Sequence, residues 1–442
     1  MRNLAGPQAL DGDPRGREGR PAYNKLPFGL DRESSVNLRQ RPMSQLRDKS
    51  VKRWLWLLRP AWIVLFAFVL RMAIMGVLLA HNKLWWGANE LGGIARAILE
   101  GRGFSSAFHD AQGPTAWFAP AYPALLACIF RVFGIETKAS AVVAILLNVT
   151  FASLTAAVIV QLGREQFHET TGIVAGWAWA IAPPLLFIPW LPWETCLSGL
   201  VFAYAFITML RLGAASRLRE WGRCGVVWGL AALVNPAIVA PLPVLAVCVA
   251  TRSRRWKGLG VMIMAFLLCV MPWTARNFRV FRHTVPVRSN FWPELYFANA
   301  DFSLHPLGNS MLYQREGEAL FVAEMKVRAI NFIRSNPSVF WKLTRERIVG
   351  FWAQPEQLWP YTLLLFLTTF GGLVVAAQRG KRWAEFAAVL SLYPLVYYVT
   401  HAFARFRYPI EPAMYILAGY LMCELWLRIR GRRKTTLAVT VG

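Results

Sequence analysis

Long apolar runs recur through most of this chain, and the first of them covers residues 60–80. A helix needs about 20 predominantly apolar residues to cross the hydrocarbon core of a bilayer. Of the 442 residues, 56% are hydrophobic and only 17% are charged, whereas soluble domains carry about 25% charged residues. The sequence therefore predicts an all-α polytopic membrane protein.

The basic residues determine the predicted topology. The formal net charge is +25, and the basic residues of membrane proteins gather in cytoplasmic loops. We expect a disordered basic cytoplasmic tail over residues 1–55 and about ten transmembrane helices. Both termini then lie in the cytoplasm of a bacterial cytoplasmic (inner) membrane. This distribution favours membrane lipids as partners and argues against nucleic acid.

The spans are expected to separate two long outer segments. The run at 118–134 is short and contains Arg131, and a crossing there would place the later arginine-rich loops outside. We therefore predict that it forms a helix that lies on the outer face of the cytoplasmic membrane. The predicted parts are a seven-span module at 56–273 with a first outer loop at 81–138, a second outer loop at 274–359, three C-terminal spans at 360–430 and a cytoplasmic tail at 431–442.

Two carboxylates are candidates for chemistry at the outer membrane edge. Glu90 stands in an aromatic, glycine-rich part of the first outer loop, a setting that suits a general base. Glu194 is the only ionisable residue between the predicted spans at 171–190 and 196–210, and it is expected to face the same cavity. For each residue the alternative is a carboxylate at a helix start, where it complements the helix dipole.

Two arginine clusters are candidates for anion binding. Arg276 with Asn277, and Arg405 with Arg407, lie where predicted spans emerge on the outer side. Guanidinium groups bind phosphate bidentately, so both clusters favour an anionic, lipid-linked ligand. The alternative is that these side chains only extend from the membrane edge into water.

Other chemistry has little support in the sequence. His305 lies in the second outer loop, where a lone histidine is usually a hydrogen-bonded loop residue, and no His, Asp and Glu set has the spacing of metal ligands. The chain also lacks a GxxxxGK phosphate loop and a GxSxG motif. We therefore expect no cofactor and no metal ligand set.

Several segments, taken in order, resemble the membrane-embedded glycosyltransferases of the GT-C superfamily. The resemblance is to the bacterial proteins related to protein O-mannosyltransferases and to the lipid A aminoarabinose transferase. It covers most of residues 60–427. The segments that carry it are WWGANELGGIARAILEGRGFSS, GPTAWFAPAYPALLACIFRVFG, LPWETCLSGL, GLAALVNPAIVAPLP, PWTARNFRVFRHTVPVRSN and RFRYPIEPAMYILAGY.

The resemblance implies a GT-C-type fold with surface helices in the first outer loop, and a polyprenyl-phosphate sugar as donor. It also implies that the catalytic residue is the acidic residue of the first outer loop, which in this chain is Glu90. We expect inverting hexosyl or pentosyl transfer on the outer face to an unknown lipid, glycan or protein acceptor. Glu194 would position a substrate, and the arginines would stabilise the leaving phosphate. The expected substrate-binding residues are Asn89, Tyr122, Asn277 and His305.

Two other classes of protein remain open. A polysaccharide ligase or polymerase would also use a lipid-linked donor and would carry a similar set of arginines. A lipid or solute transporter would use intramembrane charges, but many transporters show internal repeats, and this chain shows no second half that resembles the first.

Overall fold

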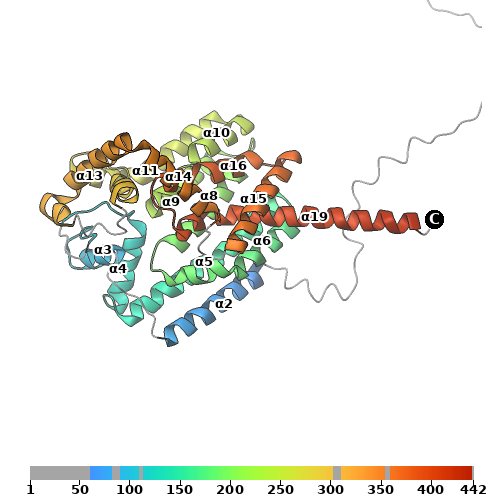
Figure 1. The fold of residues 1–442 in the computed structure, drawn as a ribbon, viewed down its shortest axis with the longest axis horizontal. Coiled ribbons are helices and arrows are strands. Elements are labelled where there is room, and N and C mark those ends of the chain that lie inside the picture. Colours follow the sequence, from blue (N-terminus) through green and yellow to red (C-terminus); the bar gives the residue numbers. More distant parts are fainter. Residues whose placement is uncertain (1–59, 82–89, 109–112, 302–309, 354–358, 441–442) are drawn as a thin grey trace, which may run out of the picture. The chain divides into compact units, whose positions relative to one another are not determined.

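The computed structural model describes residues 60–81, 90–108, 113–301, 310–353 and 359–440 (Figure 1). Within these residues the regular elements are helices, apart from one isolated bridge between Ser105 and Pro114. The prediction of an all-α chain is therefore confirmed. The expected tail at residues 1–55 lies outside the described residues.

Six of the described helical segments are long and apolar enough to cross a membrane, and a bent pair makes a seventh. The chain is thus a multi-pass membrane protein, as predicted. The six segments are α2 (Pro60–Ala80), α5 (Lys138–Gln166), η4 with α10 (Pro236–Val239 and Leu242–Ser253), α11 (Trp256–Phe281), α15 (Trp359–Gln378) and the run α18, η7 and α19 (Ala404–Arg407, Tyr408–Ile410 and Glu411–Thr440).

The remaining three predicted spans are helical but shorter. Helices α8 (Thr195–Arg211) and α9 (Leu218–Val234) have 17 residues each. The third is divided into α16 (Trp383–Leu392) and α17 (Leu395–Val399). At the C-terminus, α19 continues to Thr440, so the expected tail at 431–442 begins inside a helix.

The bent pair consists of α6 (Glu169–Ile181) followed by α7 (Pro183–Phe187) and η3 (Ile188–Trp190), and it bends by 56°. Proline lacks the backbone N–H, so the break leaves carbonyl groups without helical donors. Arg71 of α2 supplies the donors: it is fully buried and lies 3.2 Å from the Ala180 oxygen and 3.1 Å from the Trp179 oxygen. A basic residue inside an apolar run is thereby explained.

Glycines allow neighbouring helices to approach closely. A Cβ atom at Gly172 of α6 would lie 2.2 Å from the carbonyl oxygen of Val160 in α5. At Gly372 of α15 the corresponding distance to the carbonyl oxygen of Leu417 in α19 is 2.0 Å. A larger residue at either position would push the backbones apart, as expected for packing between membrane helices.

A second hydrophobic core joins the two predicted outer segments. Helix α3 (Glu90–Leu99) packs against α4 (Ala121–Phe133), and both contribute to a cluster that includes Phe321 and Met325 of α13 (Ser310–Ser335). These helices lie at the same end of the bundle in Figure 1. Helix α4 has 13 residues, about 20 Å at 1.5 Å per residue, which is too short to cross a bilayer.

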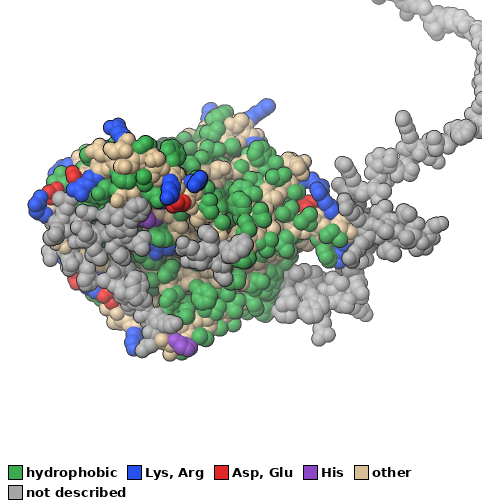
Figure 2. All heavy atoms as spheres, viewed as in Figure 1, with side chains coloured by type: hydrophobic (Ala, Val, Ile, Leu, Met, Phe, Trp, Pro, Cys, Tyr) green, Lys and Arg blue, Asp and Glu red, His purple; other side chains and the backbone are tan. Residues whose placement is uncertain are grey.

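The surface is apolar where the long helices are exposed. Figure 2 shows hydrophobic side chains over the middle of the visible face, with charged side chains gathered toward its ends. Contact with lipid explains this pattern, because large apolar side chains are unfavourable in water. On α11 the exposed apolar residues include Ile263, Met264, Leu267, Leu268 and Met271.

Candidate active site

Glu194 lies at the centre of the candidate site. It directly precedes α8, and 13% of its side chain is exposed. Its Oε1 atom lies 3.5 Å from Nη1 of Arg288. Its Oε2 atom is buried and has no hydrogen-bond partner among the described residues. A buried polar atom without a partner needs an explanation, and a bound substrate group would provide one.

The helix-start alternative separates the two candidate carboxylates. Glu194 occupies the N-cap position of α8, but its side chain makes no capping hydrogen bond there. Glu90 is the first residue of α3 and complements the dipole of that helix. Position in the helix therefore accounts for Glu90 in part, whereas no capping bond accounts for Glu194.

Arg405 brings these carboxylates into one electrostatic neighbourhood. Glu194, Glu90 and Glu294 all act on its guanidinium group. That group stacks on Trp193, with its central carbon 4.2 Å from the ring centroid. Arg405 makes no hydrogen bond or ion pair with any described residue, so its N–H groups remain available to an anion.

The Nε and Nη1 donors of Arg407, two residues after Arg405, are occupied by protein acceptors and are not available to an anion. It is 1% exposed, and its Nε atom lies 2.9 Å from Oε1 of Glu411. Its Nη1 atom donates to the carbonyl oxygens of Phe351 and Trp352 at 3.2 Å and 2.9 Å. These contacts connect α18 to α14 (Pro337–Ala353) and to α19. The expectation that Arg407 grips a phosphate is corrected to a structural role.

Arg276 is likewise engaged with the backbone. Its two Nη atoms donate to the carbonyl oxygens of Thr115 and Phe104, both at 2.7 Å. It also donates to Asn277, which is fully buried and bonds the Val285 oxygen at 3.0 Å. Arg276 therefore holds the loop before α4 against the end of α11, and Asn277 binds the segment that follows α11. Asn277 is too buried to bind a substrate, contrary to expectation, whereas the role of Arg276 in phosphate binding stays a prediction.

Tyr122, another expected substrate-binding residue, is buried in the packing of α4. Tyr122 is 2% exposed, and its hydroxyl lies 3.2 Å from Oδ1 of Asn148. Burial raises the pKa of Tyr122, so it remains a neutral packing residue of α4. Asn89 and His305 lie outside the described residues.

Solved structures show which fold this arrangement belongs to. The oligosaccharyltransferase AglB from Archaeoglobus fulgidus, in complex with an inhibitory peptide and a dolichol-phosphate, has a TM-score of 0.54. It is 15% identical to this chain and matches over 88% of it. ArnT from Cupriavidus metallidurans, bound to undecaprenyl phosphate, has a TM-score of 0.50, 16% identity and a match over 86% of this chain. The chain has a GT-C fold.

The similarity concerns the fold and only part of each relative. This chain covers 52% of the AglB chain and 63% of the ArnT chain. No family model matches the sequence, and no curated protein sequence matches it. The similarity therefore shows the fold, while the chemistry has to be argued from the side chains.

Arg288 is a residue of the candidate site that sequence reasoning missed. Besides Glu194, it contacts the carbonyl oxygen of Trp117 at 3.1 Å and lies 4.7 Å from the ring centroid of Phe118. It belongs to a basic segment that runs from Arg276 to Arg288 and contains four arginines, none of which the sequence alone distinguishes as a partner of Glu194. Only the fold shows which of them reaches the carboxylate.

A histidine and a carboxylate also meet beside Arg405. Nδ1 of His401 lies 3.1 Å from Oε2 of Glu294 in α12 (Phe291–Tyr296). The His401 ring stacks on Phe403 with centroids 5.5 Å apart. A carboxylate at Nδ1 orients the imidazole ring. The 107 residues between the partners concealed the pair in the sequence.

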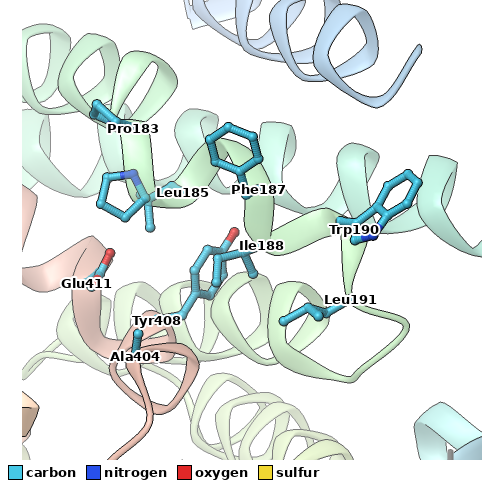
Figure 3. Close-up of a pocket in the computed structure, with 10 residues that line it drawn as sticks. Pro183, Leu185, Phe187, Ile188, Trp190, Leu191, Ala404, Tyr408 and Glu411 are labelled. Carbon is cyan, nitrogen blue, oxygen red and sulfur yellow. The ribbon is translucent and has the colours of Figure 1, made fainter. Parts of the chain in front are cut away.

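An apolar pocket of about 390 Å³ lies between the α7–η3 segment and residues 404–411. Ala404, the residue directly before Arg405 in the chain, forms part of its wall (Figure 3). Tyr408 and Glu411 come from one side of the pocket, and the α7–η3 segment forms the other side. The residues of that segment are Pro183, Pro184, Leu185, Phe187, Ile188, Trp190 and Leu191.

Metal ligands do not cluster in the part of the chain that the structure describes. There, no group of three or more His, Cys, Asp or Glu side chains could hold a metal ion.

Proposed function

We propose that this protein is a glycosyltransferase that moves a sugar from a polyprenyl phosphate to an acceptor hydroxyl or amine at the outer membrane face. One observation carries the proposal. A partly buried arginine, Arg405, makes no hydrogen bond with the described residues while it interacts electrostatically with Glu194 and Glu90. An anion site beside carboxylates suits a reaction that releases a phosphate and removes a proton.

In the proposed reaction, the oxygen or nitrogen atom of the acceptor attacks the anomeric carbon of the sugar, and Glu90 accepts the proton that this atom loses. The bond between that carbon and the phosphate oxygen breaks, and the electron pair leaves with the lipid phosphate. Arg405 stabilises the charge that develops on this phosphate. Attack from the side opposite the leaving group inverts the anomeric centre.

Glu194 and Arg288 form the second part of the proposed site. Oε1 of Glu194 faces Arg288, while Oε2 has no partner among the described residues. The Oε2 atom can accept a hydrogen bond from a sugar or acceptor hydroxyl. Glu194 would thereby orient the reacting group toward Glu90.

The pocket between α7–η3 and α18 is the proposed site for the lipid chain. Its lining is mainly apolar, and Ala404 joins it directly to Arg405. A phosphate on Arg405 would thus have its first isoprene units beside Phe187 and Ile188. The lipids in the two similar structures, dolichol-phosphate in AglB and undecaprenyl phosphate in ArnT, support this class of donor.

Transfer by purified protein tests the proposal. The protein is reconstituted with a radiolabelled undecaprenyl-phosphate sugar and an extract of envelope lipids, glycans and proteins, and release of undecaprenyl phosphate is measured. We expect release that depends on the extract and on Arg405. Arg328→Ala is the matched control, because Arg328 pairs with Glu324 on the exposed side of α13. Equal release by the parent and Arg405→Ala would refute the proposal.

A further inference from the structure

A buried carboxylate outside the proposed reaction joins three separate chain segments. Glu318 of α13 is 4% exposed. Its Oε1 atom accepts hydrogen bonds from the Ala116 amide and the Ser289 hydroxyl, both at 2.7 Å. Its Oε2 atom accepts from the Tyr313 hydroxyl at 2.7 Å and from the Thr115 hydroxyl.

The segments that Glu318 joins are those that place Arg288. Ser289, the next residue, also donates its amide to the Ala116 oxygen at 2.9 Å. Arg288 itself donates from Nε to the Trp117 oxygen at 3.1 Å. The Ser289 backbone and the Arg288 side chain are therefore bound to the backbone at 116–117, and Glu318 of α13 binds the Ser289 hydroxyl and the Ala116 amide.

The bonding leaves little freedom to the carboxylate. A carboxylate offers only acceptors, and here each oxygen already accepts two hydrogen bonds. Burial raises the pKa of Tyr313, which keeps its hydroxyl protonated as a donor. Arg276 also donates to the Thr115 oxygen at 2.7 Å. Two side chains, Glu318 and Arg276, thus hold the loop.

We propose that Glu318 is a positioning residue that fixes Arg288 beside Glu194. This inference rests on the proposed function, because it gives Arg288 a task in sugar transfer. Without Glu318, the segment at 288–289 would lose a side-chain anchor while Arg288 kept its own contact to Trp117. The guanidinium group would then sample positions away from Glu194.

Glu318→Gln tests the inference, because an amide nitrogen cannot accept the bonds of Oε2. We expect turnover to fall roughly 10- to 100-fold, the effect of a misplaced catalytic contact. In an Arg288→Ala background the same substitution should cause no further loss, since Glu318 acts through Arg288. Glu324→Gln, an exposed carboxylate on the same helix, is the matched control and should retain parental turnover.

Hydrogen exchange provides a readout that does not depend on activity. In Glu318→Gln the amides of Ala116 and Ser289 should exchange faster, whereas those of α5 should not change. Ser289→Ala removes one bond only, so it serves if Glu318→Gln does not fold, and it should show the same lack of additivity with Arg288→Ala.

Two results would overturn the inference: unchanged exchange at Ala116 and Ser289, or losses that add in the double variant. Failure of the proposed function would look different. In that case the parent protein would release no lipid phosphate, and the exchange experiment would still decide whether Glu318 anchors the loop.

Discussion

The guanidinium carbon of Arg405 lies 4.2 Å from the ring centroid of Trp193, which directly precedes Glu194. Trp193 contacts Phe118 with centroids 5.7 Å apart, and Arg288 stacks on Phe118 at 4.7 Å. Two contacting rings thus carry two arginines beside one carboxylate. Stacking orients a guanidinium group without using its N–H donors, which leaves those of Arg405 for a phosphate.

Arg405 and Arg407 should respond differently to substitution. Arg405→Ala should lower sugar transfer roughly 100- to 1,000-fold, the cost of removing one oxyanion donor, with little change in thermal stability. Arg407→Ala leaves Glu411 buried without its partner and should destabilise the protein by about 3–5 kcal/mol. Transfer rates and thermal unfolding in detergent measure the two effects. The opposite pattern would mean that Arg407 holds the phosphate.

Substitution by glutamine distinguishes the role of Glu90 from that of Glu194. If Glu90 is the general base, the Glu90→Gln variant should have a turnover roughly 100- to 10,000-fold lower, because an amide cannot accept the proton. Donor binding should persist, since the phosphate contacts Arg405. A residue that serves only the helix dipole would cost about 0.3–1 kcal/mol of stability and leave turnover intact.

Glu194→Gln is the companion variant. It keeps one oxygen for a hydrogen bond, so we expect a smaller loss of turnover than in Glu90→Gln. A larger loss in Glu194→Gln than in Glu90→Gln would transfer the role of base to Glu194. Both variants are compared for turnover and for donor binding in the same preparation.

Filling the pocket should affect long donors more than short ones. Ala404→Phe places a ring in the wall shared with Tyr408 and should raise KM for an undecaprenyl-phosphate sugar. The parent gains affinity from each methylene group it buries, at about 0.8 kcal/mol, and the variant should lose part of that gain. KM is compared for undecaprenyl and short-chain donors. An equal increase for both lengths would place the lipid chain elsewhere.

The position of α4 can be tested by cysteine labelling. Ile135 follows α4, and 40% of this residue is exposed. It is a better labelling position than the nearby Thr137, because the Thr137 hydroxyl caps α5. In a background without native cysteines, Ile135→Cys should react with an impermeant thiol reagent from outside the cell. Ala215→Cys, between α8 and α9, should react only after permeabilisation. The reverse result would show that the helix crosses the membrane.

The local chemistry of the sequence was sufficient for the helices and the class of protein. Apolar runs of sufficient length form helices in a bilayer because backbone groups must bond within their own segment. Each predicted span is accordingly helical in the structure. The short helix α4 was also predicted from the sequence, because helix length depends on residue number. The break at Pro183 was not predicted, since residues 171–190 were expected to form one continuous span.

The roles of the arginines depended on contacts between distant segments. Arg276, Arg405 and Arg407 have the same chemistry, and each stands near the end of a span. The fold gives Arg276 and Arg407 carbonyl partners that lie more than 50 residues away, while Arg405 receives an aromatic ring. A donor is free or occupied according to what packs against it, and such neighbours are set by folding rather than by local sequence.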